Sequence, residues 1–177
     1  MAELSIQHLL RDHRECARIL AELESLLDTQ KADPEWTAGR STAFARISRF
    51  FNEVVIGHIR KEEEVLFPAL EAFLPRDVGP LAVLRAEHAD TCENFRRLCV
   101  SGESSAQRDN PPQLLEDFQR AGRKVLEVVR DHIYKEDRVL FPMVARFLSP
   151  ELDAEILRRM EAISRYEASS VGPERVG

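Results

Sequence analysis

Apolar residues recur at three- and four-residue steps along most of the chain, which is the spacing of helices with one buried face. The pattern predicts five helices, over about 4–29, 35–73, 78–100, 112–147 and 150–166. Polar, turn-rich residues 101–111 predict the one long loop. No segment has a sustained two-residue alternation, so we expect no β-sheet.

These elements predict an all-α fold. We expect an up-down-up-down four-helix bundle over residues 1–148, a short fifth C-terminal helix packed on it over 149–166, and a flexible tail over 167–177. A length of 177 residues suits one domain. Pro68 should kink the second helix or mark its closing turns. The third helix is expected to bury one stripe: Leu81, Leu84, His88, Cys92, Phe95, Leu98 and Cys99.

An eleven-residue stretch occurs twice, beginning at His58 and again at His132. Both copies contain His-x-x-x-Glu and end in Val-Leu-Phe-Pro, which indicates one structural unit used twice. Four residues along a helix turn about 400°. The imidazole of His58 and the carboxylate of Glu62 therefore share a face, as do those of His132 and Glu136.

The repeat extends to a histidine on the helix that precedes each copy. His13 lies in the apolar stripe of the first helix, and His88 follows it by 75 residues, as His132 follows His58 by 74. His8 is about 140° away from His13 around the helix and falls outside the repeat. A bundle would direct the repeated polar groups into one central cavity. The set is His13, His58, Glu62, His88, His132 and Glu136.

Four imidazoles and two carboxylates suit a pair of metal ions, with two imidazoles on each ion and the carboxylates bridging. Mixed nitrogen and oxygen donors without repeated thiolates favour redox-active iron first, with manganese and zinc behind it. The alternative is a metal-free polar core, which would bury the same groups at a large cost in free energy.

Acids beside these residues have two interpretations. Asp12, Glu87 and Asp131 each precede a repeated histidine, and they either orient a ring on a neighbouring helix or lie at the surface. Four further acids are expected at the solvated surface: Glu15, Glu63, Glu64 and Asp137.

The cysteines and the charge bear on environment. Cys16, Cys92 and Cys99 form no CxxC pair, which fits a reducing compartment, and we expect them to pack as small apolar residues. A formal charge of −6 argues against nucleic acid or an anionic membrane as partner. No apolar run of about 18 residues or secretory signal is evident, so we expect a cytoplasmic protein without membrane contact.

At these residues the chain resembles the hemerythrin-like (HHE cation-binding) family, over about residues 5–148. The resemblance implies a non-haem centre of two iron ions with an oxo or hydroxo bridge, with the four histidines as terminal ligands and both glutamates bridging. Oxygen-carrying hemerythrins have a further histidine where this chain has Cys92. The chain is therefore more similar to the six-ligand branch, and Cys92 joins the residues of interest near the centre.

The resemblance implies that the protein binds, senses or scavenges a small ligand: oxygen, nitric oxide or peroxide. Two alternatives use the same ligand set, namely an enzyme with peroxidase- or catalase-like activity and an iron donor in iron–sulfur cluster repair. Catalysis needs proton donors near the metals, and no additional acid–base group is evident on the inner faces, which favours binding.

Overall fold

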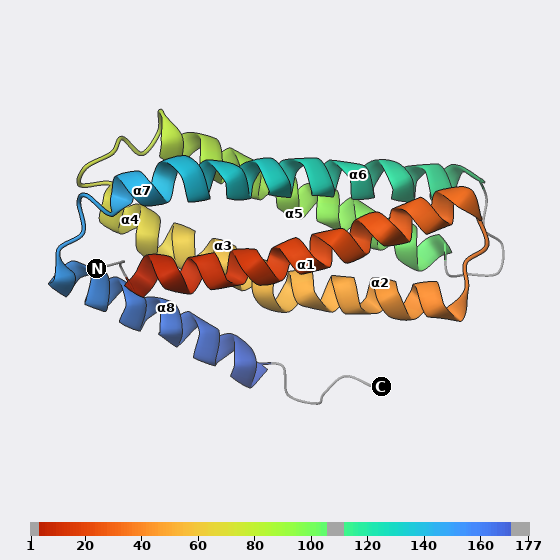
Figure 1. Cartoon of the computed structure of the whole chain (residues 1–177), viewed down its shortest axis with the longest axis horizontal. Coiled ribbons are helices and arrows are strands. Elements are labelled where there is room, and N and C mark those ends of the chain that lie inside the picture. The colour runs from red at the N-terminus through yellow and green to blue at the C-terminus, as the bar shows by residue number, and fades with distance from the viewer. Residues whose placement is uncertain (1–3, 106–111, 171–177) are drawn as a thin grey trace.

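The computed structural model describes residues 4–105 and 112–170, and every regular element in those ranges is helical. Four long helical runs of alternating direction form a bundle, and a further helix lies obliquely against one end (Figure 1). The all-α four-helix bundle is therefore confirmed. The elements are α1 (Leu4–Ala32), α2 (Ala38–Phe50), η1 (Phe51–Val55), α3 (Ile56–Lys61), η2 (Glu62–Leu66), α4 (Phe67–Leu70), α5 (Pro80–Ser105), α6 (Pro112–Lys135), η3 (Glu136–Leu140), α7 (Phe141–Val144) and α8 (Pro150–Ser170).

Two helices extend beyond their predicted ends because of tertiary contacts. α1 continues to Ala32, where the buried Gln30 side chain accepts a hydrogen bond from Gln119 Nε2 at 2.6 Å. α5 continues to Ser105, so residues 101–105 are helix rather than loop. Gly102 leaves room there for the Phe44 ring, which a Cβ would meet. The remainder of the predicted loop, 106–111, lies outside the described residues.

The fifth helix also exceeds its predicted length. α8 runs to Ser170 instead of ending near 166, so 167–170 are not a tail, and 171–177 lie outside the described residues. The Asp153 carboxylate of α8 accepts hydrogen bonds from the backbone amides of Leu4 (2.8 Å) and Ser5 (3.0 Å), and from the Ser5 hydroxyl. An acid of α8 thus caps the start of α1, satisfying amides that have no partner within their own helix.

Three π-helical segments interrupt the second and fourth runs, and two of them share a cause. In η2 the Phe67 amide donates to the Glu62 carbonyl, five residues back, immediately before Pro68. The proline ring has no N–H and crowds the carbonyl four residues before it, that of Glu64. Arg159 of α8 donates to this carbonyl at 3.1 Å. η3 repeats the arrangement, with a bond to the Glu136 carbonyl ahead of a proline.

The core consists of two apolar clusters separated along the bundle by a layer of polar residues. Along α1, Leu9 belongs to one cluster and Cys16 to the other, and His13 lies between them. Along α5, His88 lies between Leu84 and Phe95 in the same way. Side chains that the sequence predicts as metal ligands therefore occupy the middle of the bundle, shielded from solvent at both ends.

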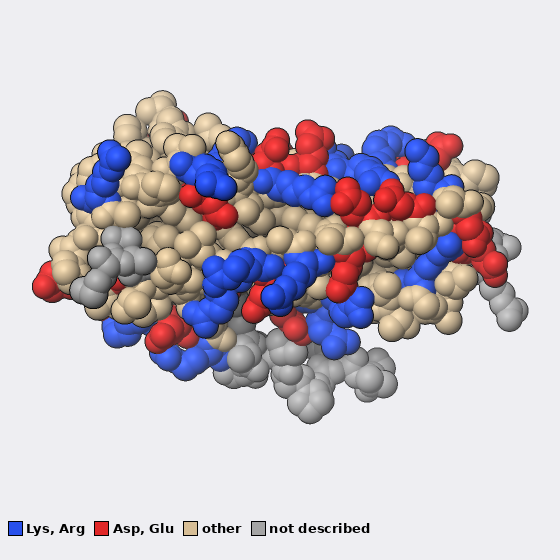
Figure 2. Space-filling model, viewed as in Figure 1, with Lys and Arg blue, Asp and Glu red and all other residues tan. Residues whose placement is uncertain are grey.

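Basic and acidic side chains are interleaved over the face shown in Figure 2. Within the described residues, no helix combines the length and the apolar character needed to cross a bilayer.

Candidate metal centre

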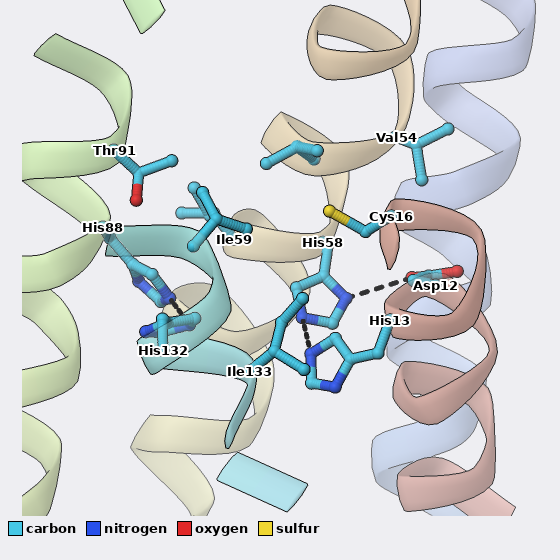
Figure 3. Close-up of a pocket in the computed structure, with 12 residues that line it drawn as sticks. Asp12, His13, Cys16, Val54, His58, Ile59, His88, Thr91, His132 and Ile133 are labelled. Carbon is cyan, nitrogen blue, oxygen red and sulfur yellow. Dashed lines mark hydrogen bonds and ion pairs between the residues drawn. The ribbon is translucent and has the colours of Figure 1, made fainter. Parts of the chain in front are cut away.

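Two pairs of histidines meet in the polar layer. His13 of α1 and His58 of α3 place their Nε2 atoms 3.0 Å apart, and the Nε2 atoms of His88 (α5) and His132 (α6) are 3.1 Å apart (Figure 3). All four side chains are buried. Each pair therefore joins two different helical runs, as expected when inward-facing residues of a bundle converge.

Each buried glutamate lies between the two pairs. Glu136 places Oε2 3.1 Å from His13 Nε2 and Oε1 3.2 Å from His132 Nε2. Glu62 places Oε1 3.5 Å from His58 Nε2 and Oε2 3.1 Å from His88 Nε2. Each carboxylate thus presents one oxygen to each pair, and both side chains have no exposed surface. This is the arrangement that bridging carboxylates between two cations require.

The donor atoms form two overlapping groups of metal-ligand type. Those of Glu62, His88, His132 and Glu136 lie within 4.8 Å of one another, as do those of His13, His58 and Glu136. The structure therefore brings together all six residues that the repeat singles out.

An acid contacts the other nitrogen of every imidazole. Asp12 lies 3.2 Å from His58 Nδ1, and Glu87 lies 3.1 Å from His132 Nδ1. Both acids also pair with a lysine, Asp12 with the buried Lys61 at 2.9 Å and Glu87 with Lys135. Asp12 and Glu87 thus contact rings on neighbouring helices.

Two acids predicted to lie at the solvated surface contact imidazoles instead. Glu63 lies 2.8 Å from His88 Nδ1, and Asp137 lies 2.7 Å from His13 Nδ1. Asp131 is exposed on α6, and in the described structure it pairs with no imidazole. The repeat itself carries the missed signal, because an acid directly follows the repeated glutamate in both copies.

The donor set offers lone pairs to metal cations. When Nδ1–H of a neutral imidazole donates to its acid, Nε2 is left as an acceptor, so the facing Nε2 atoms and the carboxylates converge lone pairs on one space. Within the described structure, the four oxygens of Glu62 and Glu136 are buried and have no hydrogen-bond partner. Buried anions of this kind require compensating positive charge, and the residues present fit a pair of metal ions.

The buried carboxylates also shift the pKa values of the histidines, because they stabilise positive charge on the imidazoles. Burial opposes the charging of His58, but the carboxylates of Glu62, Asp12 and Glu136 together outweigh it and raise the pKa of His58 to about 10. For His132, burial is outweighed by Glu136 together with Glu62 and Glu87, and the pKa of His132 rises to about 9. The pKa of Glu136 is held well below its usual range, despite burial, by the surrounding imidazoles. Without metal the rings take up protons, and metal binding would release them.

One side of the centre is closed and the other holds a cavity. Phe141 stacks on His13 with ring centroids 5.5 Å apart, and Phe67 stacks on His88 at 5.7 Å. A cavity of about 30 Å³ adjoins all four imidazoles. Since one water-sized sphere needs roughly 10–15 Å³, the cavity has room for a ligand of about two to three heavy atoms. The cavity is lined by Asp12, His13, Cys16, Val54, Val55, His58, Ile59, His88, Thr91, Val129, His132 and Ile133.

The cysteines are placed differently from the sequence prediction. Cys16 is buried and lines the cavity, and Cys99 is partly buried. Cys92 is exposed, so its predicted place in the buried stripe of α5 is wrong. The stripe passes instead through Thr91, which is 4% exposed and lines the cavity. The steps 84–88–91–95 in α5 match 9–13–16–20 in α1, a parallel already present in the sequence.

The fold and the site define a class of protein: a four-helix bundle with a buried cluster of imidazoles and carboxylates that fits metal cations. Residues 4–144 match the model of one protein family, described as the hemerythrin HHE cation binding domain, and the chain belongs to that family. No curated protein and no solved structure matched the chain. The predicted family membership is thus confirmed, while the six-ligand branch stays a prediction.

Proposed function

We propose that the protein holds two iron ions in this centre and uses them to bind, sense or scavenge a small ligand of the size of oxygen, nitric oxide or peroxide. The observation that carries the proposal is the position of Glu62 and Glu136, each with one oxygen toward each histidine pair. Two matched sets of donors that share both carboxylates favour two ions over one.

The chain's own residues would perform three tasks. The histidine pairs hold the ions, and the acids at Nδ1 keep each imidazole in the orientation that presents Nε2. Phe67 and Phe141 close one side of the centre, so a ligand reaches it from the cavity. Iron would supply redox chemistry to this site when bound, which zinc would not.

The cavity supports a binding role. Its walls are mostly apolar apart from the imidazoles, Asp12 and the side chains of Cys16 and Thr91. Burial raises the pKa of the Cys16 thiol to about 12, so the thiol is a poor proton donor at neutral pH. Asp12 is already engaged with His58 and Lys61, which lower its pKa to about 2 against the opposing effect of burial. Neither group is suited to repeated proton delivery.

Anaerobic reconstitution with ferrous iron tests the proposal. Elemental analysis should give two iron ions per chain, and Glu136→Ala should lose both together. One ion or fewer in reconstituted wild-type protein would refute the paired site. The loaded protein is then exposed separately to oxygen, nitric oxide and hydrogen peroxide and followed by absorption. A lasting, reversible spectral change supports binding, sustained consumption of peroxide supports an enzyme, and transfer of iron to an apo acceptor supports iron delivery.

A further inference from the structure

The two halves of the centre are related by the repeat, but the cavity wall breaks that relation at one pair of positions. His88 follows His13 by 75 residues, and Thr91 follows Cys16 by the same interval. Both residues of this second pair line the cavity, three residues beyond their histidines. The His13–His58 half therefore has a thiol in the wall where the His88–His132 half has a hydroxyl.

Within the described structure the Thr91 side chain is only 4% exposed and makes no hydrogen bond. Its oxygen is not among the fully enclosed unpaired polar atoms, so it keeps some accessible surface in the cavity wall. Two other hydroxyls on these helices donate to the backbone of the preceding turn. Ser101 Oγ donates to the Arg97 carbonyl at 2.9 Å, and Thr29 Oγ1 to the Ser25 carbonyl at 3.0 Å. Figure 3 shows the Thr91 oxygen pointing toward the side on which His88 and His132 lie. A hydroxyl in the cavity wall that makes no hydrogen bond within the protein is free to donate to a molecule in the cavity, which points to a ligand.

The other residues of the cavity lining offer weaker hydrogen-bond donors or none. Cys16 is 6% exposed, and a thiol is a weak hydrogen-bond donor. The apolar residues Val54, Ile59, Val129 and Ile133 of the lining have no polar side-chain atom. Asp12 is a carboxylate that already accepts from His58 and Lys61. Thr91 is thus the cavity residue with a free, strong donor.

We propose that Thr91 donates a hydrogen bond through Oγ1–H to the small ligand in the cavity and directs the ligand's accepting atom toward the His88–His132 half. This inference rests on the proposed function, because it assumes that the ligand binds beside the paired ions. It goes further in making the two halves unequal: their metal donors match, but only one half has a donor for the ligand.

The test uses iron-loaded, oxidised protein with azide as the probe. Thr91→Val keeps the β-branched shape and removes the hydroxyl, while Thr91→Ser keeps a hydroxyl. Thr91→Val should weaken azide binding roughly ten- to hundredfold, as expected for the loss of one hydrogen bond to an anion. Thr91→Ser should recover part of the loss, and the vibrational frequencies of ¹⁵N-labelled azide should shift in the valine variant. Thr29→Val, an exposed threonine on α1, is the matched control and should bind azide as wild type does.

Two further measurements separate this inference from its alternatives. Iron content should stay at the wild-type value in Thr91→Val, because the hydroxyl is not one of the donors to the ions. The metal-free valine variant should unfold at the same or a higher temperature, because it loses a hydroxyl that makes no hydrogen bond within the protein. Unchanged azide affinity with full iron content would overturn the inference and leave the proposed function intact. Lower stability without metal would assign the hydroxyl a structural role and overturn it equally. Failure of the wild-type protein to bind iron would refute the proposed function itself.

Discussion

Removal of the Asp137 carboxylate should weaken metal binding while leaving the bundle folded. Asp137 Oδ1 lies 2.7 Å from His13 Nδ1, the shortest of the four acid–imidazole contacts, and its side chain is 33% exposed. An acid that orients a metal-binding histidine commonly contributes about 10- to 100-fold to metal affinity, or about 1.4–2.7 kcal/mol. Solvent screens a carboxylate that is one third exposed. We therefore expect Asp137→Ala to lower the affinity for iron by about tenfold, the smaller end of this range.

A second substitution separates charge from orientation. In Asp137→Asn the amide oxygen can still accept from His13 Nδ1–H, so the ring keeps its orientation and loses only the nearby charge. We therefore expect a smaller loss of affinity than in Asp137→Ala. Asp131→Ala is the matched control, because it removes the same side chain from an exposed position on the same helical run. Its metal affinity should stay within about twofold of wild type, as for surface charges in general.

The assay is anaerobic competition for ferrous iron against a chelator of known affinity, with retained iron measured by elemental analysis. Circular dichroism of each metal-free variant checks that the bundle is intact. The reasoning is refuted if Asp137→Ala retains iron as wild type does. Equal losses in Asp137→Ala and Asp131→Ala would instead indicate a general effect of net charge, with no specific role for the contact to His13.

Three other predictions address the centre, the fifth helix and the cysteines. Glu136→Ala should reduce the occupancy of both ions together, whereas His8→Ala should leave iron content unchanged, and elemental analysis distinguishes them. Asp153→Ala removes the cap from the first amides of α1 and should lower the free energy of unfolding by about 2–3 kcal/mol in urea denaturation. In the native protein an alkylating reagent should modify exposed Cys92 and spare buried Cys16 until denaturant is added, which peptide mass spectrometry measures; modification of Cys16 first would contradict the described packing.

The convergence of the six donors was predictable from the sequence because it depends on the geometry of single helices and on their apolar faces. The angle between His58 and Glu62 depends only on helix geometry, and the repeat places the same pair at His132 and Glu136. An apolar stripe around His13 shows that its ring faces inward. Helices with one apolar face must bury it, and four of them bury it together. No knowledge of helix packing beyond this is needed to gather the donors.

The acids around the imidazoles were less predictable because they depend on the register between helices. Glu63 and Asp137 each lie five residues after the histidine of their own run, or about 140° around an ideal helix. They therefore point away from their own ring, and helix geometry alone suggests solvent. The structure places each beside a ring on an adjacent run, at His88 and His13. Such a contact follows from the axial stagger of packed helices, which the residue pattern of one helix does not specify.

The prediction for Cys92 was wrong for a different reason. From His88, a step of three residues and a step of four both remain near the inner face, so Thr91 and Cys92 compete for one place. Hydrophobicity alone predicts that the cysteine faces the core, because a thiol is less polar than a hydroxyl. Packing decides for Thr91, because α5 repeats the steps of α1 in which Cys16 takes that place. Comparison of the two halves is thus a better guide here than hydrophobicity, since it tests the register of both helices at once.

The π-helical turns connect the backbone to the centre. Glu62 begins η2 and Glu136 begins η3, and in each the carbonyl of the glutamate accepts the five-residue bond that precedes a proline. Such turns are rare within α-helices and are frequent at functional sites. Here the proline, the widened turn and the fully buried glutamate recur together in both halves. The same π-helical turn thus accompanies each carboxylate that faces both histidine pairs. We infer that the turn helps to position that carboxylate, since packing at one end of the bundle would not produce it in both halves.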